Sequence, residues 1–244
     1  MWRWIFIKEL DGETKEQLIY SLSNIFELPS KNLINILSEL PENITKEEVY
    51  NEVTKFAKNK KYGAIYVFHY TRCSDEIIKN IKKYGLVNAI DAMNYIFDDI
   101  YLHFKENITI DDYTKLVKKI KNIYSKIIRN PKEDNCINGL LLNVVPYNKL
   151  HFLIKGQGPE LVCDVINEMS KEYNFFQKYH DYMKPYIIKV KITDQCKEKY
   201  LVVLTYYLYL LIQNGDDYSI LEYTLTFNDT KNIVYIKEVE EENE

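Results

Sequence analysis

The sequence contains few of the small and reactive residues from which many enzyme sites are built. Its 244 residues include only seven glycines, four cysteines and four histidines. None of the motifs GxxxxGK[ST], HExxH or GxSxG occurs, and no GxGxxG follows a predicted strand. These absences exclude the easily recognised NTPases, zincins, α/β-hydrolases and Rossmann dehydrogenases.

The cysteine spacing argues against a metal centre. Cys73, Cys136, Cys163 and Cys196 lie far apart and form no CxxC pair. We therefore expect no bound metal, and reduced thiols rather than a disulfide framework. The spacing of the cysteines and histidines does not exclude a catalytic pair of a cysteine nucleophile and a histidine base.

Charge and hydropathy limit the partners that the chain can have. A net charge of −4, from 32 basic and 36 acidic residues, gives no global positive field to attract nucleic acid. The longest apolar run, residues 200–212, is shorter than the roughly 20 residues that cross a bilayer. Residues 1–13 lack the small-residue cleavage site of a secretory signal. We expect a cytoplasmic protein with no transmembrane segment.

Hydrophobic periodicity and capping residues predict a mixed chain. Three helices are predicted to begin after Thr14, Thr45 and Ser74, and Gly85 is placed to end the third. Further helices are predicted over residues 31–40, 89–104, 109–129, 159–173 and 195–213, and strands over residues 2–7, 64–70, 139–145, 150–154, 186–192, 218–227 and 232–239. This order predicts an α+β fold in which helices interrupt a mostly antiparallel sheet. We expect a helical N-terminal unit at residues 1–60, an α+β domain at residues 61–240 and an acidic tail at residues 241–244.

Two stretches carry polar residues next to predicted helix N-termini. His69, Thr71 and Arg72 stand at the end of the strand predicted over residues 64–70, just before a helix. Such a place suits hydroxyl or phosphate binding. Glu160 follows a Gly-Gln-Gly sequence near the start of another predicted helix. The alternatives are a partly buried strand histidine with a satisfied hydrogen bond, and a glutamate that complements the helix dipole.

A third stretch places Glu222 within the strand predicted over residues 218–227. Glutamate is depleted from strands, and a buried carboxylate needs a partner or a purpose. The alternative is a position that faces solvent on an antiparallel strand.

Together these stretches resemble the ADP-ribosyltransferase-like superfamily. Many bacterial and phage members begin with a strand that ends in H-x-T, followed by a helix with an I..I...GL pattern. The matching residues here are His69-Tyr-Thr71, Ile77, Ile78, Ile81, Gly85 and Leu86. Members tend to end with a strand that bears the catalytic glutamate, a turn and an I..I strand, and residues 222–236, EYTLTFNDTKNIVYI, are similar. The resemblance covers roughly residues 64–239 and leaves out the N-terminal 60 residues.

The resemblance implies a split antiparallel sheet that binds NAD as substrate in a cleft between its halves. Glu222 would be the catalytic residue, because a carboxylate stabilises the oxocarbenium-like transition state as nicotinamide leaves. His69 would hold the adenosine-side ribose, and Thr71 or Arg72 would contact a hydroxyl or the pyrophosphate. Glu160 joins these as a cofactor-binding candidate.

This sequence also departs from the family pattern. The tyrosine or serine that supports nicotinamide is not identified by the motif, and Tyr147 and Tyr186 are candidates by location only. Residues 228–231, Asn-Asp-Thr-Lys, replace the usual proline-rich turn. Ile220 stands two positions before Glu222, where protein-arginine modifiers carry Gln or Glu. This argues against arginine as the acceptor of ADP-ribose. DNA, RNA, another side chain or hydrolysis of free NAD therefore remain as possibilities.

Three functions are compatible with these features. The first is an NAD-dependent ADP-ribosyltransferase that modifies an unknown macromolecular acceptor, a protein or a nucleic acid, as a toxin or a factor in phage–host conflict. The second is a non-catalytic protein that binds a partner through the same pocket or through the N-terminal helices. The third is a nucleic-acid binder that uses the lysines of the helix predicted over residues 109–129, although such lysines usually form a solvated face. These lysines are Lys115, Lys118, Lys119, Lys121 and Lys126.

Overall fold

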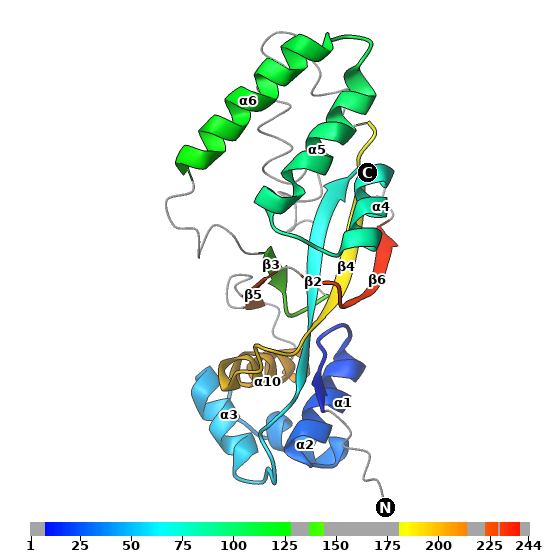
Figure 1. Ribbon diagram of the computed structural model, residues 1–244. Helices are drawn as coiled ribbons and strands as arrows, with labels where there is room; N and C mark the ends of the chain where they lie inside the picture. The colour runs from blue at the N-terminus through cyan, green and yellow to red at the C-terminus, as the bar shows by residue number, and fades with distance from the viewer. Residues whose placement is uncertain (1–7, 128–136, 144–180, 214–222, 229, 240–244) are drawn as a thin grey trace, which may run out of the picture. The chain divides into compact units, whose positions relative to one another are not determined.

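A computed structural model of the chain describes residues 8–127, 137–143, 181–213, 223–228 and 230–239 (Figure 1). These residues form an α+β fold, which confirms the predicted class. The helices are α1 (Lys15–Phe26), α2 (Ser30–Ser38), α3 (Lys46–Thr54), α4 (Asp75–Tyr84), α5 (Ala89–Phe104), α6 (Ile110–Ile127) and α10 (Glu198–Ile212). The strands are β1 (Glu9–Leu10), β2 (Ala64–Cys73), β3 (Ile137–Leu140), β4 (Lys184–Ile192), β5 (Thr224–Phe227) and β6 (Ile233–Glu238).

The strands form one open, six-stranded sheet in the order β5-β3-β2-β4-β6, with β1 paired to β2. β1 runs parallel to β2 and places Glu9 opposite Ala64, whereas β3 runs antiparallel and places Leu140 opposite Phe68. β2 is largely buried along its length, as its nearly continuous run of apolar residues predicts. The split of the sheet into two halves stays a prediction, because the strand predicted over residues 150–154 lies outside the described residues.

The chain divides into two compact units, each with its own packing. Unit 1 comprises Met1–Phe68, Asn138–Val145 and Lys189–Leu225, and unit 2 comprises His69–Ile137, Pro146–Ile188 and Thr226–Glu244. Both β2 and β4 contribute residues to each unit. The boundary predicted at residue 60 stays a prediction, and the tail predicted over residues 241–244 lies outside the described residues.

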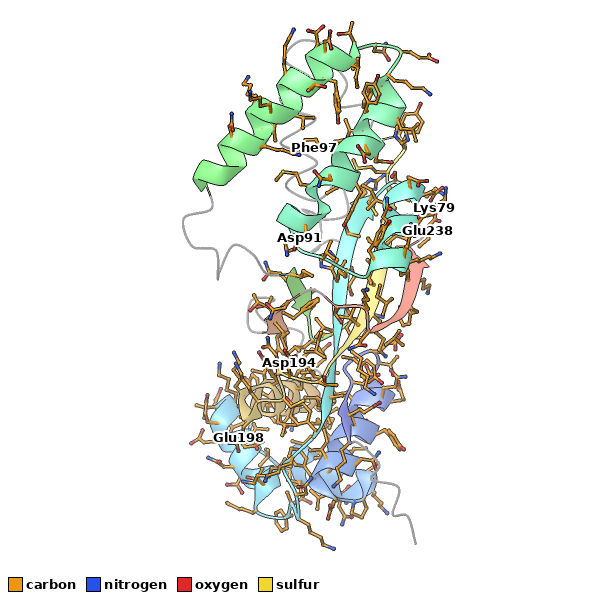
Figure 2. The ribbon with its side chains drawn as sticks, in the orientation of Figure 1. Lys79, Asp91, Phe97, Asp194, Glu198 and Glu238 are labelled. Atoms are coloured by element: carbon orange, nitrogen blue, oxygen red, sulfur yellow. The ribbon has the colours of Figure 1, made fainter. Side chains whose placement is uncertain are left out.

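In unit 1, α10 packs against α1, α2 and α3 (Figure 1). Leu201, Leu204 and Leu208 are among its buried residues, and two tyrosine hydroxyls, one from α10 and one from α3, make hydrogen bonds around this packing. The Tyr209 hydroxyl donates to the carbonyl oxygen of Pro41 (2.7 Å), and the Tyr50 hydroxyl donates to Glu198 in the first turn of α10 (2.8 Å; Figure 2). None of the helices in the described part of the chain has the length and hydropathy needed to cross a membrane.

A buried lysine joins β4 to the segment that follows β1 in unit 1. Lys189 is 5% exposed, and its ammonium lies 2.6 Å from Asp11 and 2.5 Å from Glu13. The same ammonium lies 4.4 Å from the centroid of the Tyr66 ring, within the range of a cation–π interaction. Burial raises the pKa of Asp11, although its hydrogen bond to Lys189 acts in the opposite direction. The pairing matters because removing one member leaves a buried charge without compensation.

Gly12 lies between the two carboxylates and allows the segment to approach residues 141–143 closely. Its carbonyl oxygen accepts a hydrogen bond from the backbone N–H of Asn143 (3.2 Å). A Cβ atom at Gly12 would overlap the carbonyl oxygen of Leu141, so only glycine fits here without a backbone shift.

In unit 2, α5 and α6 form an antiparallel pair (Figure 1). The Tyr113 hydroxyl of α6 donates to the backbone carbonyl of Phe97 in α5. Lys121 donates to the side chain of Asn94 (2.9 Å) and lies 5.7 Å from the centroid of the Phe97 ring (Figure 2). These contacts hold α6 against α5 at both polar and apolar positions.

The predicted helix starts are confirmed and some strand bounds are corrected. Thr14, Thr45 and Ser74 each accept a backbone hydrogen bond as an N-cap, and Thr45 forms a full capping box with Glu48. β2 continues to Cys73 instead of ending at residue 70, because the polar residues of its last part are buried within the strand. β3 begins at Ile137 instead of residue 139 and ends at Leu140, whereas residues 144–145 of the predicted strand lie outside the described residues. The strand predicted over residues 2–7 and the helix predicted over residues 159–173 lie outside the described residues.

The Lys189 pairing predicts unequal effects for two lysines of the same strand. Lys189→Met should lower the free energy of unfolding by about 3–5 kcal/mol, because Asp11 and Glu13 lose their buried partner. The matched control is Lys191→Met, since Lys191 and its partner Glu9 are 32% and 35% exposed. We expect it to cost at most about 1 kcal/mol. Urea unfolding measures both values, and equal losses would contradict the assigned role of Lys189.

Candidate functional site

The sequence-predicted residues of β2 lie within the strand and not beyond its end. His69 is half-buried, whereas Thr71 and Arg72 are 8% and 6% exposed. Alternate residues of a strand share a face, so His69 and Thr71 lie on one face and Arg72 on the other. Of the two residues predicted to contact the same ligand as His69, the strand geometry therefore favours Thr71.

The end of β2 leads into a buried polar cluster in unit 2. The Ser74 hydroxyl donates to Asp99 Oδ1 (2.8 Å) and accepts the backbone N–H of Ile77 (3.2 Å). Asp99 is 2% exposed. His103 Nδ1 lies 2.8 Å from the carbonyl oxygen of Asp99 and 3.7 Å from its Oδ1. A carbonyl oxygen only accepts hydrogen bonds, so Nδ1 carries a proton.

This cluster positions helices and does not have the order of a hydrolase triad. A serine nucleophile needs a base beside its hydroxyl, but Ser74 contacts the carboxylate of Asp99. Its second bond caps α4. The cluster thus fixes the start of α4 against α5. Sequence reasoning did not single out Asp99, although the spacing Asp99-x-x-x-His103 places both residues on one helix face.

Tyr186, a sequence-predicted candidate, uses its hydroxyl within unit 2. The hydroxyl donates to Asp75 Oδ1 (2.7 Å), and Lys184 contacts the other carboxylate oxygen of Asp75 (3.4 Å). The hydrogen bond from Tyr186 holds the pKa of Asp75 below its ordinary value. Burial, followed by the contact with Asp75, raises the pKa of Tyr186. The phenol therefore stays protonated at physiological pH and ties β4 to the first turn of α4.

The other predicted site residues, Glu222, Tyr147 and Glu160, lie outside the described residues. The neighbour of Glu222, Tyr223, is described and is 2% exposed. Its carbonyl oxygen accepts the backbone N–H of Leu141 (2.7 Å). Whether Glu222 meets His69 stays a prediction.

The end of the first resembling segment and the turn of the last one meet in unit 2. Leu86 forms an isolated antiparallel bridge with Thr230, through two backbone hydrogen bonds of 2.8 and 2.9 Å. Gly85, which ends α4 at φ 95°, packs directly against the Thr230 carbonyl, where a Cβ atom would overlap it. The glycine is required both by its positive φ and by this close approach.

The two described cysteines are not activated thiols. Burial raises the pKa of the Cys73 thiol, which is 0% exposed, and also raises the pKa of Cys196. Since the thiolate is the nucleophile, neither residue supports the Cys–His alternative. In the described ranges, no group of three or more His, Cys, Asp or Glu residues is arranged to hold a metal ion.

The lysine face of α6 is already used in part within unit 2. Lys121 contacts Asn94 and Phe97, as described above, and Lys115 pairs with Asp112 (3.1 Å). Asp112 offsets the charge of Lys115, and Lys121 is held against α5, so both lysines are less available to a phosphate backbone.

Comparison with known proteins adds no assignment to this geometry. No protein-family model matches the chain, and no curated protein or solved structure does so either.

The Asp99 cluster predicts a large effect at one of two adjacent aspartates. Asp99→Ala should lower the free energy of unfolding by roughly 1–3 kcal/mol, because it leaves the buried Ser74 hydroxyl without its acceptor. Asp98→Ala is the matched control, since Asp98 is exposed on the same helix, and it should change stability by less than about 0.5 kcal/mol. Thermal or urea unfolding distinguishes them, and a neutral Asp99→Ala would contradict the cluster's role.

The Tyr186–Asp75 hydrogen bond predicts a pH-dependent contribution to stability. The carboxyl pKa is depressed in the folded protein, so the contribution is present above the ordinary value of 3.8 and is lost as pH falls through the depressed pKa. Tyr186→Phe should raise the pKa of Asp75 and should destabilise the protein more at neutral pH than at pH values well below 3.8. NMR titration of the Asp75 carboxyl measures the shift. Tyr182→Phe should leave it unchanged, because Tyr182 packs on His103.

Proposed function

We propose that the chain is an NAD-dependent ADP-ribosyltransferase-like protein, which cleaves the nicotinamide–ribose bond and transfers ADP-ribose to an acceptor. The bridge between Leu86 and Thr230 carries this proposal. It brings the GL residues that end the first resembling segment against the turn of the last one. Two short segments that resemble one family in the right order, and that also make backbone contact, support a common origin more strongly than either segment alone.

The local structure of the first segment also supports the proposal. A strand carries His69 and Thr71 on one face, a capped helix follows at once, and a glycine with positive φ ends that helix. This is the strand–helix–glycine succession that the resemblance implies.

The proposed reaction needs a charge that acts on the transition state. The bond between nicotinamide and ribose C1′ breaks, and nicotinamide leaves with the electron pair. An acceptor nucleophile forms the new bond to C1′ and loses its proton. Glu222 stabilises the positive charge that develops on the ribose, and it accepts or orients the acceptor's proton. His69 holds the adenosine-side ribose, and Thr71 contacts a hydroxyl or the pyrophosphate.

The proposal predicts nicotinamide release that depends on Glu222. Glu222→Gln should lower the rate of release from NAD by roughly 10²–10³-fold, because one preorganised charge is lost from the transition state. Glu238→Gln is the control: Glu238 ends β6 and forms an exposed pair with Lys184 (3.7 Å; Figure 2), so the rate should not change. The assay follows nicotinamide, with and without cell extract as a source of acceptor.

The same assay separates the catalytic and non-catalytic interpretations. NAD binding that is weakened by His69→Ala, without any release of nicotinamide, would assign the chain as a binding protein that retains the pocket. If the chain neither binds NAD nor releases nicotinamide from it, the proposed function is refuted. Loss of activity in both Glu222→Gln and Glu238→Gln would also count against the role given to Glu222.

A further inference from the structure

An open groove of about 440 Å³ lies between the end of α4 and β6 in unit 2. Figure 2 marks Lys79 on α4 and Glu238 on β6, the two elements that flank it. The lining combines three lysines with apolar and aromatic side chains and one glycine. These residues include Lys82, Lys83, Gly85, Lys231, Ile233 and Tyr235. Its volume falls within the range of small-molecule sites, about 300–1,000 Å³.

The three lysines of the groove differ from other lysines nearby. Within the described residues, no carboxylate forms an ion pair with Lys82, Lys83 or Lys231. In contrast, Lys79 pairs with Glu76 at 2.8 Å, and Lys184 pairs with both Asp75 and Glu238. The groove is therefore a local concentration of uncompensated positive charge in a chain whose net charge is −4.

Helix capping explains only part of this charge. Lys82 and Lys83 lie in the last turn of α4, where cations complement a partial negative charge of about half a unit. One lysine is enough to balance that partial charge. Lys231 does not belong to α4 and approaches the groove from the turn that contains Thr230. An excess of about two positive charges therefore remains after the dipole is balanced.

The lining matches a ligand with several phosphate charges and a flat apolar group. Lysine binds phosphate as a point charge, and a terminal phosphate carries about −1.5 to −2 charges. Three lysines thus match a diphosphate better than a monophosphate. Gly85 contributes only backbone to the lining at the end of α4. Tyr235 and Ile233 offer the apolar surface on which a base can stack.

We propose that this groove binds a nucleoside diphosphate, with Lys82, Lys83 and Lys231 on the phosphates and Tyr235 beside the base. The proposal rests on the groove's own residues, and it stands whether or not the protein releases nicotinamide from NAD.

Calorimetric titration of the full chain with ADP, inorganic pyrophosphate and adenosine tests the site. ADP and pyrophosphate should bind, more weakly at higher salt, and adenosine should not bind detectably. Lys82→Gln combined with Lys231→Gln should weaken ADP binding by roughly 100-fold, about ten-fold for each lost charged contact. The control Lys79→Gln removes a lysine of the same helix that is already paired, and it should leave the affinity unchanged.

A second variant separates base recognition from phosphate recognition. Tyr235→Leu should weaken ADP binding by roughly ten-fold and leave pyrophosphate binding unchanged, with thermal unfolding as the check that the variant is folded. Absence of ADP binding would overturn the proposal, as would equal binding of adenosine or an equal loss in Lys79→Gln. A single-stranded oligonucleotide that binds more tightly than ADP, and that is lost in the lysine variant, would assign the groove to nucleic acid instead.

Discussion

The burial of Lys189 between Asp11 and Glu13 is the interaction on which the arrangement of unit 1 depends. The acids Glu9, Asp11 and Glu13 alternate along the chain, as do Lys189 and Lys191 on β4, and these residues pair across the two segments. A shift of one residue in either segment would move every charge to the wrong face. Because a buried charge without a partner is costly, the pairing selects one register for the N-terminal segment. Gly12 makes that register possible, since Gly12 itself approaches residues 141–143 closely.

Much of the helical structure could be predicted because helix starts are local. Thr14, Thr45 and Ser74 act on backbone groups within three residues, so their signals are complete in a short stretch of sequence. The positive φ of Gly85 at the end of α4 is a similarly local signal, although the close approach of Thr230 is not. The end of β2 and the start of α4, which form part of the candidate site, could therefore be predicted from the sequence.

The charged contacts could not be predicted, because their partners are distant in the chain. Lys189 stands between apolar residues of β4, where a lysine is expected to face solvent, yet it is buried. Arg72 has the appearance of a loop residue, although β2 continues through it. The burial of Asp99 depends on Ser74, which sequence reasoning used only as a cap. In each case, tertiary packing decides the environment of a polar residue whose local sequence permits either outcome.

The long sequence separation of these contacts has a consequence for biosynthesis. Asp11 and Lys189 are 178 positions apart, and Tyr209 lies 168 positions after Pro41. The chain is made from its N-terminus, so α1, α2 and α3 emerge long before α10 and Lys189 exist. During that interval Asp11 and Glu13 remain hydrated, and the apolar faces of the first helices lack their partner. Unit 1 is therefore completed late, by a segment that closes a long loop at an entropic cost. Until then the nascent chain exposes surface that chaperones recognise.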